Sequence, residues 1–215
     1  MPFNSVIALE LHGGKPLSPL VNAGAIATTS LINAENVEQR WQRILHIQQQ
    51  LAGEQVALSD EVNQSEQTTN FHNRAIAWLL YSAEYLYCDA MEACDVYTRQ
   101  CSTLLNTVEL ATLGATLAAG GVNPLTHERV LQADNVPYIL AEMMMEGLYG
   151  RSGDWAYRVG LPGKSGVGGG ILAVVPGVMG IAAFSPPLDE EGNSVRGQKM
   201  VASVAKQLGY NVFKG

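Results

Sequence analysis

Apolar side chains recur at helical spacing through much of the first part of this chain. Between Val37 and Leu51 they follow each other at near-helical intervals, which predicts an amphipathic helix. Between Asn73 and Tyr87 they occur almost all round a helical projection, which predicts a buried helix at the centre of the fold. The pattern therefore favours helical structure over this region.

Two further helices are indicated by the residues at their ends. Asn106, followed three residues later by Glu109, is typical of an N-cap with its capping-box partner, and the helix that it opens is predicted to stop at Gly120-Gly121. A second helix is predicted from Asn135 to near Gly147, with a proline close to its start. Residues 1 to about 150 are thus predicted to be mainly helical.

The pattern changes beyond this point. Short apolar runs at Trp155–Val159, Ile171–Val175 and Val178–Phe184 predict three strands, and Pro176-Gly177 predicts the turn that joins the last two. The segment Met200–Leu208 again has helical spacing and predicts a terminal helix.

The order of these elements predicts the class of fold. A helical lobe beside an antiparallel sheet that carries a terminal helix is an α+β arrangement. We divide the chain into residues 1–150, the helical lobe, and residues 151–215, the strands and the last helix, as two parts of one domain.

Charge and composition exclude several classes of partner. The 215 residues include 13 basic and 20 acidic side chains, for a net charge of −7, with no basic cluster. This excludes a nucleic-acid footprint and removes the electrostatic reason to bind an anionic membrane. Charged residues make up only 15 % of the chain, so much of its surface is expected to be hidden in a large core or in a homo-oligomer, a dimer or a tetramer.

Cysteine and histidine indicate neither a disulfide framework nor a metal site. Cys88, Cys94 and Cys101 are odd in number and lack C-x-x-C spacing, and the four histidines lack metal-ligand spacing. No signal peptide and no membrane-spanning run is evident. We therefore expect reduced thiols, no metal site formed by these residues, and a cytoplasmic location.

The most informative stretch is Gly160-Leu-Pro-Gly-Lys-Ser-Gly-Val-Gly-Gly-Gly170. A phosphate-binding loop would need glycine at the position of Arg158 and a helix directly afterwards, and a strand is predicted there instead. The alternative is a strand edge with lysine, a hydroxyl and glycine, of the kind that supplies an oxyanion donor in serine acyl-transfer enzymes. A glycine-rich hairpin without chemistry remains possible for this stretch taken alone.

Several separated motifs, in one order, resemble the serine-dependent bacterial glutaminases. These amidohydrolases have the β-lactamase and penicillin-binding-protein fold, and the resemblance covers the whole chain, closest to cytosolic enterobacterial members. The segments that carry it are Pro2-Phe-Asn-Ser5, Pro19-Leu-Val-Asn-Ala-Gly-Ala25, Ser65-Glu66, Asn73-Arg-Ala-Ile-Ala-Trp78, Tyr97 before Cys101-Ser102, and Gly160 to Gly170.

The resemblance assigns the substrate-binding residues in the first half of the chain. Asn22 matches an asparagine that binds substrate, Glu66 matches the carboxylate that pairs with the α-amino group of glutamine, and Asn73 matches a further polar contact. An amino-acid amide suits such a set, because its amino group needs a fixed carboxylate and its polar ends need hydrogen-bonding side chains. Taken singly, each residue could instead serve as a cap or a loop residue.

The resemblance also assigns residues to the reaction. Tyr97 and Tyr149 match two tyrosines that contact substrate and are candidate proton carriers, and the backbone N–H of Val167 matches the oxyanion-hole donor. Lys164 and Ser165 occupy the strand position of the lysine–hydroxyl pair of β-lactamases. Without the resemblance, Tyr97 could simply anchor a helix by its ring.

The nucleophile of the family is a serine followed three residues later by a lysine, upstream of the segment that matches Pro2-Phe-Asn-Ser5. We therefore expect an N-terminally truncated version of the fold that lacks this serine. One Ser-x-x-Lys is present, Ser203-Val-Ala-Lys206, but it is expected on the polar side of the terminal helix, where a solvated lysine is no base.

The resemblance implies hydrolysis of L-glutamine to L-glutamate and ammonia through a serine-bound glutamyl ester, with no metal or organic cofactor. It also implies that this chain alone is an incomplete enzyme. The alternative is a non-catalytic fragment that binds amino acids weakly or associates with intact subunits. A penicillin-recognising acyl-transferase is disfavoured by Glu66, which suits a free amino acid better than a β-lactam.

Overall fold

The computed structural model describes residues 4–214, so Pro2 and Phe3 of the first family-like segment lie outside the described residues. Within this range the chain folds into two compact units. The first unit takes the described residues up to Gln48 together with Gln55–Leu104, and the second takes Gln49–Glu54 and the described residues from Leu105 onward.

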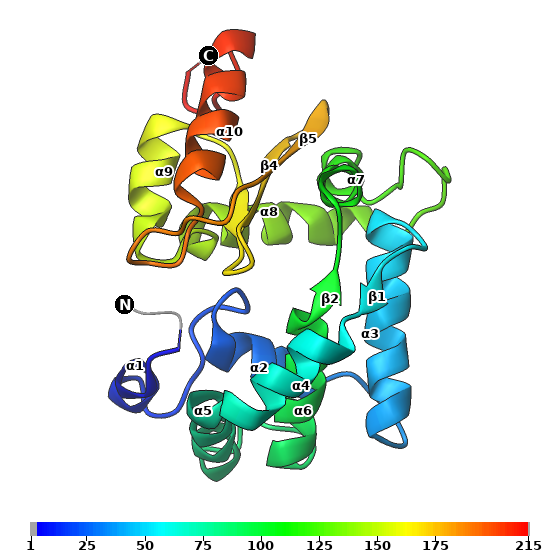
Figure 1. Ribbon diagram of the computed structural model, residues 1–215, viewed down its shortest axis with the longest axis vertical. Coiled ribbons are helices and arrows are strands. Elements are labelled where there is room, and N and C mark those ends of the chain that lie inside the picture. Colours follow the sequence, from blue (N-terminus) through cyan, green and yellow to red (C-terminus); the bar gives the residue numbers. More distant parts are fainter. Residues whose placement is uncertain (1–3, 215) are drawn as a thin grey trace. The chain divides into compact units, whose positions relative to one another are not determined.

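The first unit is helical, with one short antiparallel ladder between β1 and β2 (Figure 1). Its elements are α1 (Val6–Leu11), α2 (Asn22–Ser30), most of α3 (Val37–Ala52), β1 (Ala57–Leu58), α4 (Asp60–Thr69), α5 (Phe71–Ser82), α6 (Ala90–Cys101) and β2 (Thr103–Leu104). The helix predicted from Val37 to Leu51 is confirmed as α3.

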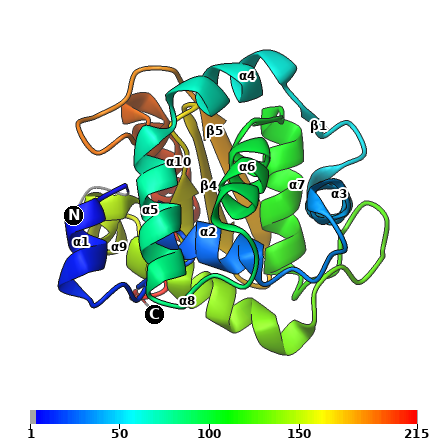
Figure 2. The ribbon, with the colours of Figure 1, turned by 90° about the horizontal axis from the view of Figure 1, so that it is seen from below.

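A hydrophobic core joins the helices α2, α5 and α6, and Figure 2 shows α5 alongside α6 with α2 crossing them. Fully buried Ile26, Ile76 and Leu80 lie at its centre. The prediction that the helix from Asn73 to Tyr87 is buried all round is wrong. The helix ends at Ser82, and Trp78 and Tyr81 are each about half exposed, because α5 packs against the core by one face only.

The second unit combines helices with an antiparallel sheet in the order β3-β4-β5. Its elements are α7 (Thr107–Ala118), the 3₁₀ turn Ala133–Asn135, α8 (Val136–Glu146), the 3₁₀ turn Tyr149–Arg151, α9 (Ser152–Arg158), β3 (Gly163–Ser165), β4 (Gly170–Val175), β5 (Met179–Phe184) and α10 (Val195–Leu208).

The two faces of this sheet are covered by different helices, as Figure 1 shows for α7 and α10. On β4, Ile171, Ala173 and Val175 join the core cluster that includes Val201 of α10. The alternate residue Leu172 faces Gly114 of α7. Because successive strand residues point to opposite faces, α7 and α10 lie on opposite sides of β4.

Most predicted boundaries in this unit are confirmed. The capping box of Asn106 and Glu109 is present, α8 ends before Gly147, and α10 is capped by Gly209 in the left-handed region at φ 74°. The strand predicted at Trp155–Val159 is wrong, because Trp155–Arg158 forms the end of the helix α9 and Val159 is its C-cap. The terminal helix predicted over Met200–Leu208 is confirmed as part of α10, in which Val201 and Ala205 are buried and Leu208 is about half exposed.

The compact units separate between Leu104 and Leu105 because α7 and α8, both upstream of residue 150, pack with the sheet. The change from helices to strands does fall close to residue 150. The division into residues 1–150 and 151–215, as two parts of one domain, stays a prediction.

Candidate functional site

Three of the predicted substrate-binding residues are joined by hydrogen bonds in the first unit. Asn22 Nδ2 donates to Asn73 Oδ1 at 2.7 Å, and the Tyr97 hydroxyl donates to Asn22 Oδ1 at 3.0 Å. The two contacts use both ends of the Asn22 carboxamide, so its orientation is fixed. We call Asn22, Asn73 and Tyr97 the amide triad.

The helices bring the amide triad together because its members lie on or next to the helix faces that pack into the core. Asn73 shares its side of α5 with buried Ile76 and Leu80, and Tyr97 follows buried Ala90 and Ala93 on α6. Residues three, four and seven apart share one helix face, so this packing directs the two polar side chains inward. Tyr97 is 8 % exposed, which leaves its hydroxyl near the edge of the core.

The start of α2 positions Asn22, and a glycine makes that position possible. Asn22 is the first residue of α2, and Gly24 lies where a Cβ atom would overlap the backbone carbonyl of Ser18. The preceding loop can therefore run directly against the helix only because residue 24 has no side chain. This explains the Asn-Ala-Gly order physically.

Glu66 is not part of the amide triad. It lies on the exposed side of α4, and none of the described hydrogen bonds joins its carboxylate to Asn22, Asn73 or Tyr97. Its neighbour Gln67 ties α4 to α6 by a 2.7 Å hydrogen bond to Asp95. Glu66 is therefore held on a fixed helix with its carboxylate free to meet a ligand.

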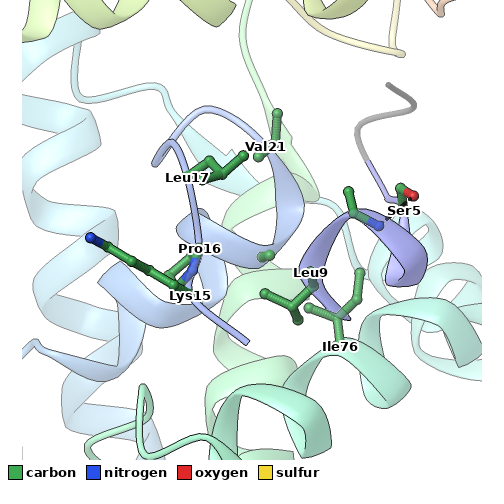
Figure 3. Close-up of a pocket in the computed structure, with 9 residues that line it drawn as sticks. Ser5, Leu9, Lys15, Pro16, Leu17, Val21 and Ile76 are labelled. Carbon is green, nitrogen blue, oxygen red and sulfur yellow. Dashed lines mark hydrogen bonds between the residues drawn. The ribbon is translucent and has the colours of Figure 1, made fainter. Parts of the chain in front are cut away.

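A small pocket lies beside the start of α2 in the same unit (Figure 3). Its volume is about 50 Å³, and Leu9, Leu17, Val21 and Ile76 give it an apolar wall. Figure 3 shows the Lys15 side chain extending away from the other labelled residues. The pocket has room for a few water molecules and is far smaller than the roughly 300–1,000 Å³ of sites that bind small molecules, so it is no amino-acid site.

In the second unit the predicted residues gather at the β3 edge. Lys164 Nζ donates to the Tyr149 hydroxyl at 3.3 Å and lies 4.4 Å from the centre of the Tyr149 ring. Lys164 also donates to the backbone carbonyl of Ser165, which accepts from the Tyr149 hydroxyl at 3.4 Å. The cation is thus held against the tyrosine face and hydroxyl together.

Tyr149 has an unusual backbone conformation. Its φ is +54°, in the left-handed region that residues with a Cβ atom seldom adopt. Such a conformation costs of order 1–3 kcal/mol and persists only where the surrounding structure imposes it. Here the ring lies under Lys164, and the next turn is held by the Ser152 hydroxyl, which donates to the Tyr149 carbonyl at 2.9 Å.

Val167 lies in the turn between β3 and β4. The ends of this turn are fixed, because Gly166 N donates to Gly170 O at 3.0 Å and Ser185 N donates to Gly169 O at 3.0 Å. The Val167 side chain is 56 % exposed, and within residues 4–214 no acceptor takes its backbone N–H. This amide is therefore free to donate to a ligand oxygen.

Ser165 is buried, and its surroundings contain residues that the sequence prediction missed. Its hydroxyl donates to Asn193 Oδ1, and its backbone N–H donates to Gly147 O at 3.0 Å. Asn193 is fully buried and also donates to Leu148 O at 3.3 Å. Ser165 is thus occupied in fixing the β3 edge.

Asp189 organises the loop that carries Asn193. Its Oδ1 accepts from the backbone N–H groups of Glu191 and Asn193 at 3.1 and 2.9 Å, and its Oδ2 accepts from Gln198 at 3.0 Å. Burial alone would raise the pKa of Asp189, but these hydrogen bonds outweigh it and hold the pKa below the ordinary value. The only sequence signal was the turn pattern of an acidic residue before Gly192-Asn193-Ser194.

The Ser-x-x-Lys pair lies on the polar side of the terminal helix, as the sequence predicts. Ser203 and Lys206 are both exposed on α10, and the Ser203 hydroxyl accepts a hydrogen bond from Gln207 at 2.9 Å. An exposed pair of this kind cannot generate an activated serine. Among the described residues, no three metal-ligating side chains gather at one point.

The chain superimposes on a probable glutaminase from Bacillus subtilis with a TM-score of 0.95 at 34 % identity, over 99 % of this chain and 72 % of that one. Glutaminase structures have a β-lactamase-like fold, and this chain has that fold.

The family model "Glutaminase" matches residues 1–213, and the chain belongs to the glutaminase family. It is 98 % identical to glutaminase 1 of Escherichia coli strain K12 over all 215 residues, which are 69 % of that protein's length. A B. subtilis glutaminase solved as a covalent complex with 5-oxo-L-norleucine, formed from 6-diazo-5-oxo-L-norleucine, has a TM-score of 0.89 at 31 % identity, over 98 % of this chain and 79 % of that one.

Proposed function

We propose that the chain is part of an enzyme that hydrolyses L-glutamine to L-glutamate and ammonia through a serine-bound glutamyl ester. In this reaction the serine oxygen bonds to the amide carbon, ammonia leaves, and water then cleaves the ester. The observation that carries the proposal is the 98 % identity to the E. coli glutaminase over every residue of the chain. This match does not favour the alternative of a non-catalytic binding fragment.

The amide triad and Glu66 are proposed to bind glutamine. A carboxylate on a fixed helix suits the α-amino group of the substrate, and Glu66 has its carboxylate exposed on α4. Asn22 and Asn73 offer oriented carboxamides, and Tyr97 fixes the Asn22 oxygen. Their mutual hydrogen bonds set the geometry before substrate arrives, which lowers the entropy cost of binding.

Val167 and Tyr149 are proposed to serve the chemical step. The Val167 N–H, which has no acceptor within residues 4–214, suits an oxyanion that forms only during acyl transfer. Tyr149 has its hydroxyl beside the Lys164 ammonium, so Tyr149 is suited to carry a proton. Tyr97 is the second candidate for that role, and Lys164 and Ser165 support the β3 edge.

We propose that the attacking serine lies outside these 215 residues, in the part of the E. coli relative that the match with this chain does not cover. The physical support is the exposure of Ser203 and Lys206, the one Ser-x-x-Lys pair in the sequence. A polypeptide of these residues alone is then an incomplete enzyme, because Asn22, Glu66 and the tyrosines cannot form the glutamyl ester in its place.

The cellular setting is proposed to be the cytoplasm, with the protein as a homo-oligomer. None of the described helices has the length and apolarity of a membrane crossing. The low fraction of charged residues and the exposed aromatic side chains of α5 suit a surface that another copy covers.

The test compares two polypeptides in an ammonia-release assay with L-glutamine. One consists of the 215 residues. The other, which we call the extended polypeptide, also contains the part of the E. coli relative that the match with this chain does not cover. We expect turnover by the extended polypeptide and at least roughly 1000-fold less by the 215 residues alone, as for loss of a serine nucleophile. Equal turnover would refute the proposed position of the serine, and no turnover by the extended polypeptide would refute the glutaminase proposal.

Ser203→Ala in the extended polypeptide is the matched control. Because Ser203 is exposed and bonded only to Gln207 among the described hydrogen bonds, this change should leave turnover within about twofold of the unaltered protein. A collapse of activity in this variant would instead assign the nucleophile to α10.

A further inference from the structure

A second cavity, of about 280 Å³, lies within the second unit and contains none of the residues proposed for glutamine hydrolysis. It is lined by two helices, α9 and α10, which Figure 1 shows beside each other, together with Asp189. The α9 side consists of Asp154, Trp155 and Arg158 with the flanking cap residues Arg151 and Val159, and the α10 side consists of Val195, Gln198, Lys199 and Ala202.

Each helix presents a continuous stripe to this cavity. The α9 residues are spaced at intervals of three and four, and so are the α10 residues, which places each set on one helix face. Trp155 and Val159 belong to the hydrophobic core of the unit and give the cavity an apolar floor. The Trp155 indole is fixed there by a 2.8 Å hydrogen bond to Leu161 O.

The charges around the cavity leave two cations without a partner. Asp154 is paired with Arg151 at 3.2 Å, and both oxygens of Asp189 accept hydrogen bonds from its own loop and from Gln198. In contrast, within residues 4–214 no carboxylate lies in ion-pair distance of Arg158 or Lys199. The cavity therefore combines a planar guanidinium and an ammonium with an apolar floor.

We propose that this cavity is a binding site for a small organic carboxylate. The carboxylate would accept hydrogen bonds from Arg158 and Lys199, since a guanidinium matches the two oxygens of a carboxylate. The apolar part of the ligand would lie against Trp155 and Ala202. A cavity of this size takes one small molecule, because sites for drug-sized ligands are about 300–1,000 Å³.

The test titrates phenylacetate into the 215-residue protein and follows the indole N–H signal of Trp155 by two-dimensional NMR. We expect saturable shifts with a dissociation constant of about 1 mM or tighter. Phenylacetamide, which lacks the charge, and inorganic phosphate, which lacks the apolar part, should each bind at least about 10-fold more weakly. Phosphate binding as tight as that of phenylacetate, or absence of saturation, would overturn the proposal.

The double variant R158Q/K199Q removes both cations and should weaken phenylacetate binding at least about 10-fold. The matched control is R196Q/K206Q, which removes one arginine and one lysine that are exposed on α10 outside the cavity and should bind normally. Ala202→Phe fills the apolar part with the charges intact and should also abolish binding. An equal loss of phenylacetate binding in the control would contradict the site. Binding retained in R158Q/K199Q or in Ala202→Phe would also contradict it.

Discussion

The hydrogen bonds of Asn22 show how much one side chain can depend on its neighbours. Tyr97 fixes the oxygen and Asn73 fixes the amide nitrogen, so a change at either position removes one of the two restraints on the carboxamide. The sequence predicted all three residues, but only as separate members of a family-like set. Nothing in their spacing of 51 and 75 residues indicated that they contact one another.

Tyr97→Phe tests this dependence in the extended polypeptide. It removes the hydroxyl that donates to Asn22 and keeps the ring in the core, so we expect kcat/KM for glutamine to fall at least about 10-fold. Steady-state ammonia release gives the value. Tyr138→Phe, at a tyrosine 75 % exposed on α8, is the control and should change nothing. Unaltered kinetics in Tyr97→Phe would remove Tyr97 from the proposed site.

Asp189 gives a pH-dependent prediction. Because its pKa is lower in the folded chain than the ordinary 3.8, its carboxylate stabilises the fold above that pH, and this contribution disappears as the pH falls through the lowered value. Asp189→Asn should therefore lower the free energy of unfolding at pH 7 by about 1 kcal/mol or less, because solvent screens a partly exposed carboxylate, and progressively less on acidification below pH 3.8.

Urea unfolding at a series of pH values measures this difference. Glu190→Gln, at the exposed neighbouring position, should lower stability little at any pH. A cost of Asp189→Asn that stays constant down to the acid limit would show that the charge of Asp189 does not hold the loop.

At the scale of elements, sequence patterns predicted the helices α3, α7, α8 and α10, but they gave no signal for α6 and predicted a strand in one short helical segment. The capping box at Asn106 and the glycine at 209 are local signals, and both boundaries are confirmed. The segment Trp155–Val159 is rich in residues that favour strands, yet it is helical. Its tryptophan is fixed by the core and by Leu161 O, so tertiary packing outweighs local preference.

The close packing of α7 on β5 depends on two glycines. A Cβ atom on Gly180 would overlap the backbone of α7 at Ala111, and one on Gly114 would meet Leu172. Gly180→Ala should therefore separate the helix from the sheet and lower unfolding stability by about 2 kcal/mol or more. Gly153→Ala, in open space on α9, is the control and should be neutral or stabilising. Thermal unfolding measures the stability of both variants. Equal stability of the two would contradict the close packing.

The exposed aromatic face of α5 makes a prediction about assembly. Phe71, Trp78 and Tyr81 are 67 %, 51 % and 53 % exposed and lie on the side of α5 opposite its buried residues. The pattern of an all-apolar helix could not reveal which side neighbouring helices cover. If another copy covers this face, W78Q/Y81Q in the extended polypeptide should reduce the mass of the oligomer to roughly half or less.

Light scattering during size-exclusion chromatography gives that mass. The control Y138Q/Y157Q changes two tyrosines that are even more exposed, 75 % and 85 %, and should assemble normally. The same mass for both double variants would show that the α5 face is no interface.

At the scale of the whole molecule, the family could be predicted from the sequence because several separated motifs agreed, although each alone had an ordinary structural explanation. Membership of the glutaminase family is confirmed by the match over residues 1–213. The Asp189–Asn193 network could not be predicted, since it depends on a loop that returns to β3 after an intervening hairpin. The α9–α10 cavity arises in the same way from helices distant in sequence.

Labelling with 6-diazo-5-oxo-L-norleucine tests the central claim most directly, because this compound gave the covalent complex of the B. subtilis glutaminase. Intact-mass spectrometry would compare the 215-residue chain with the extended polypeptide after exposure to the reagent. We predict one covalent adduct on the extended polypeptide, suppressed by excess L-glutamine, and none on the 215 residues alone. An adduct on the 215-residue chain, or none on the extended polypeptide, would contradict the account.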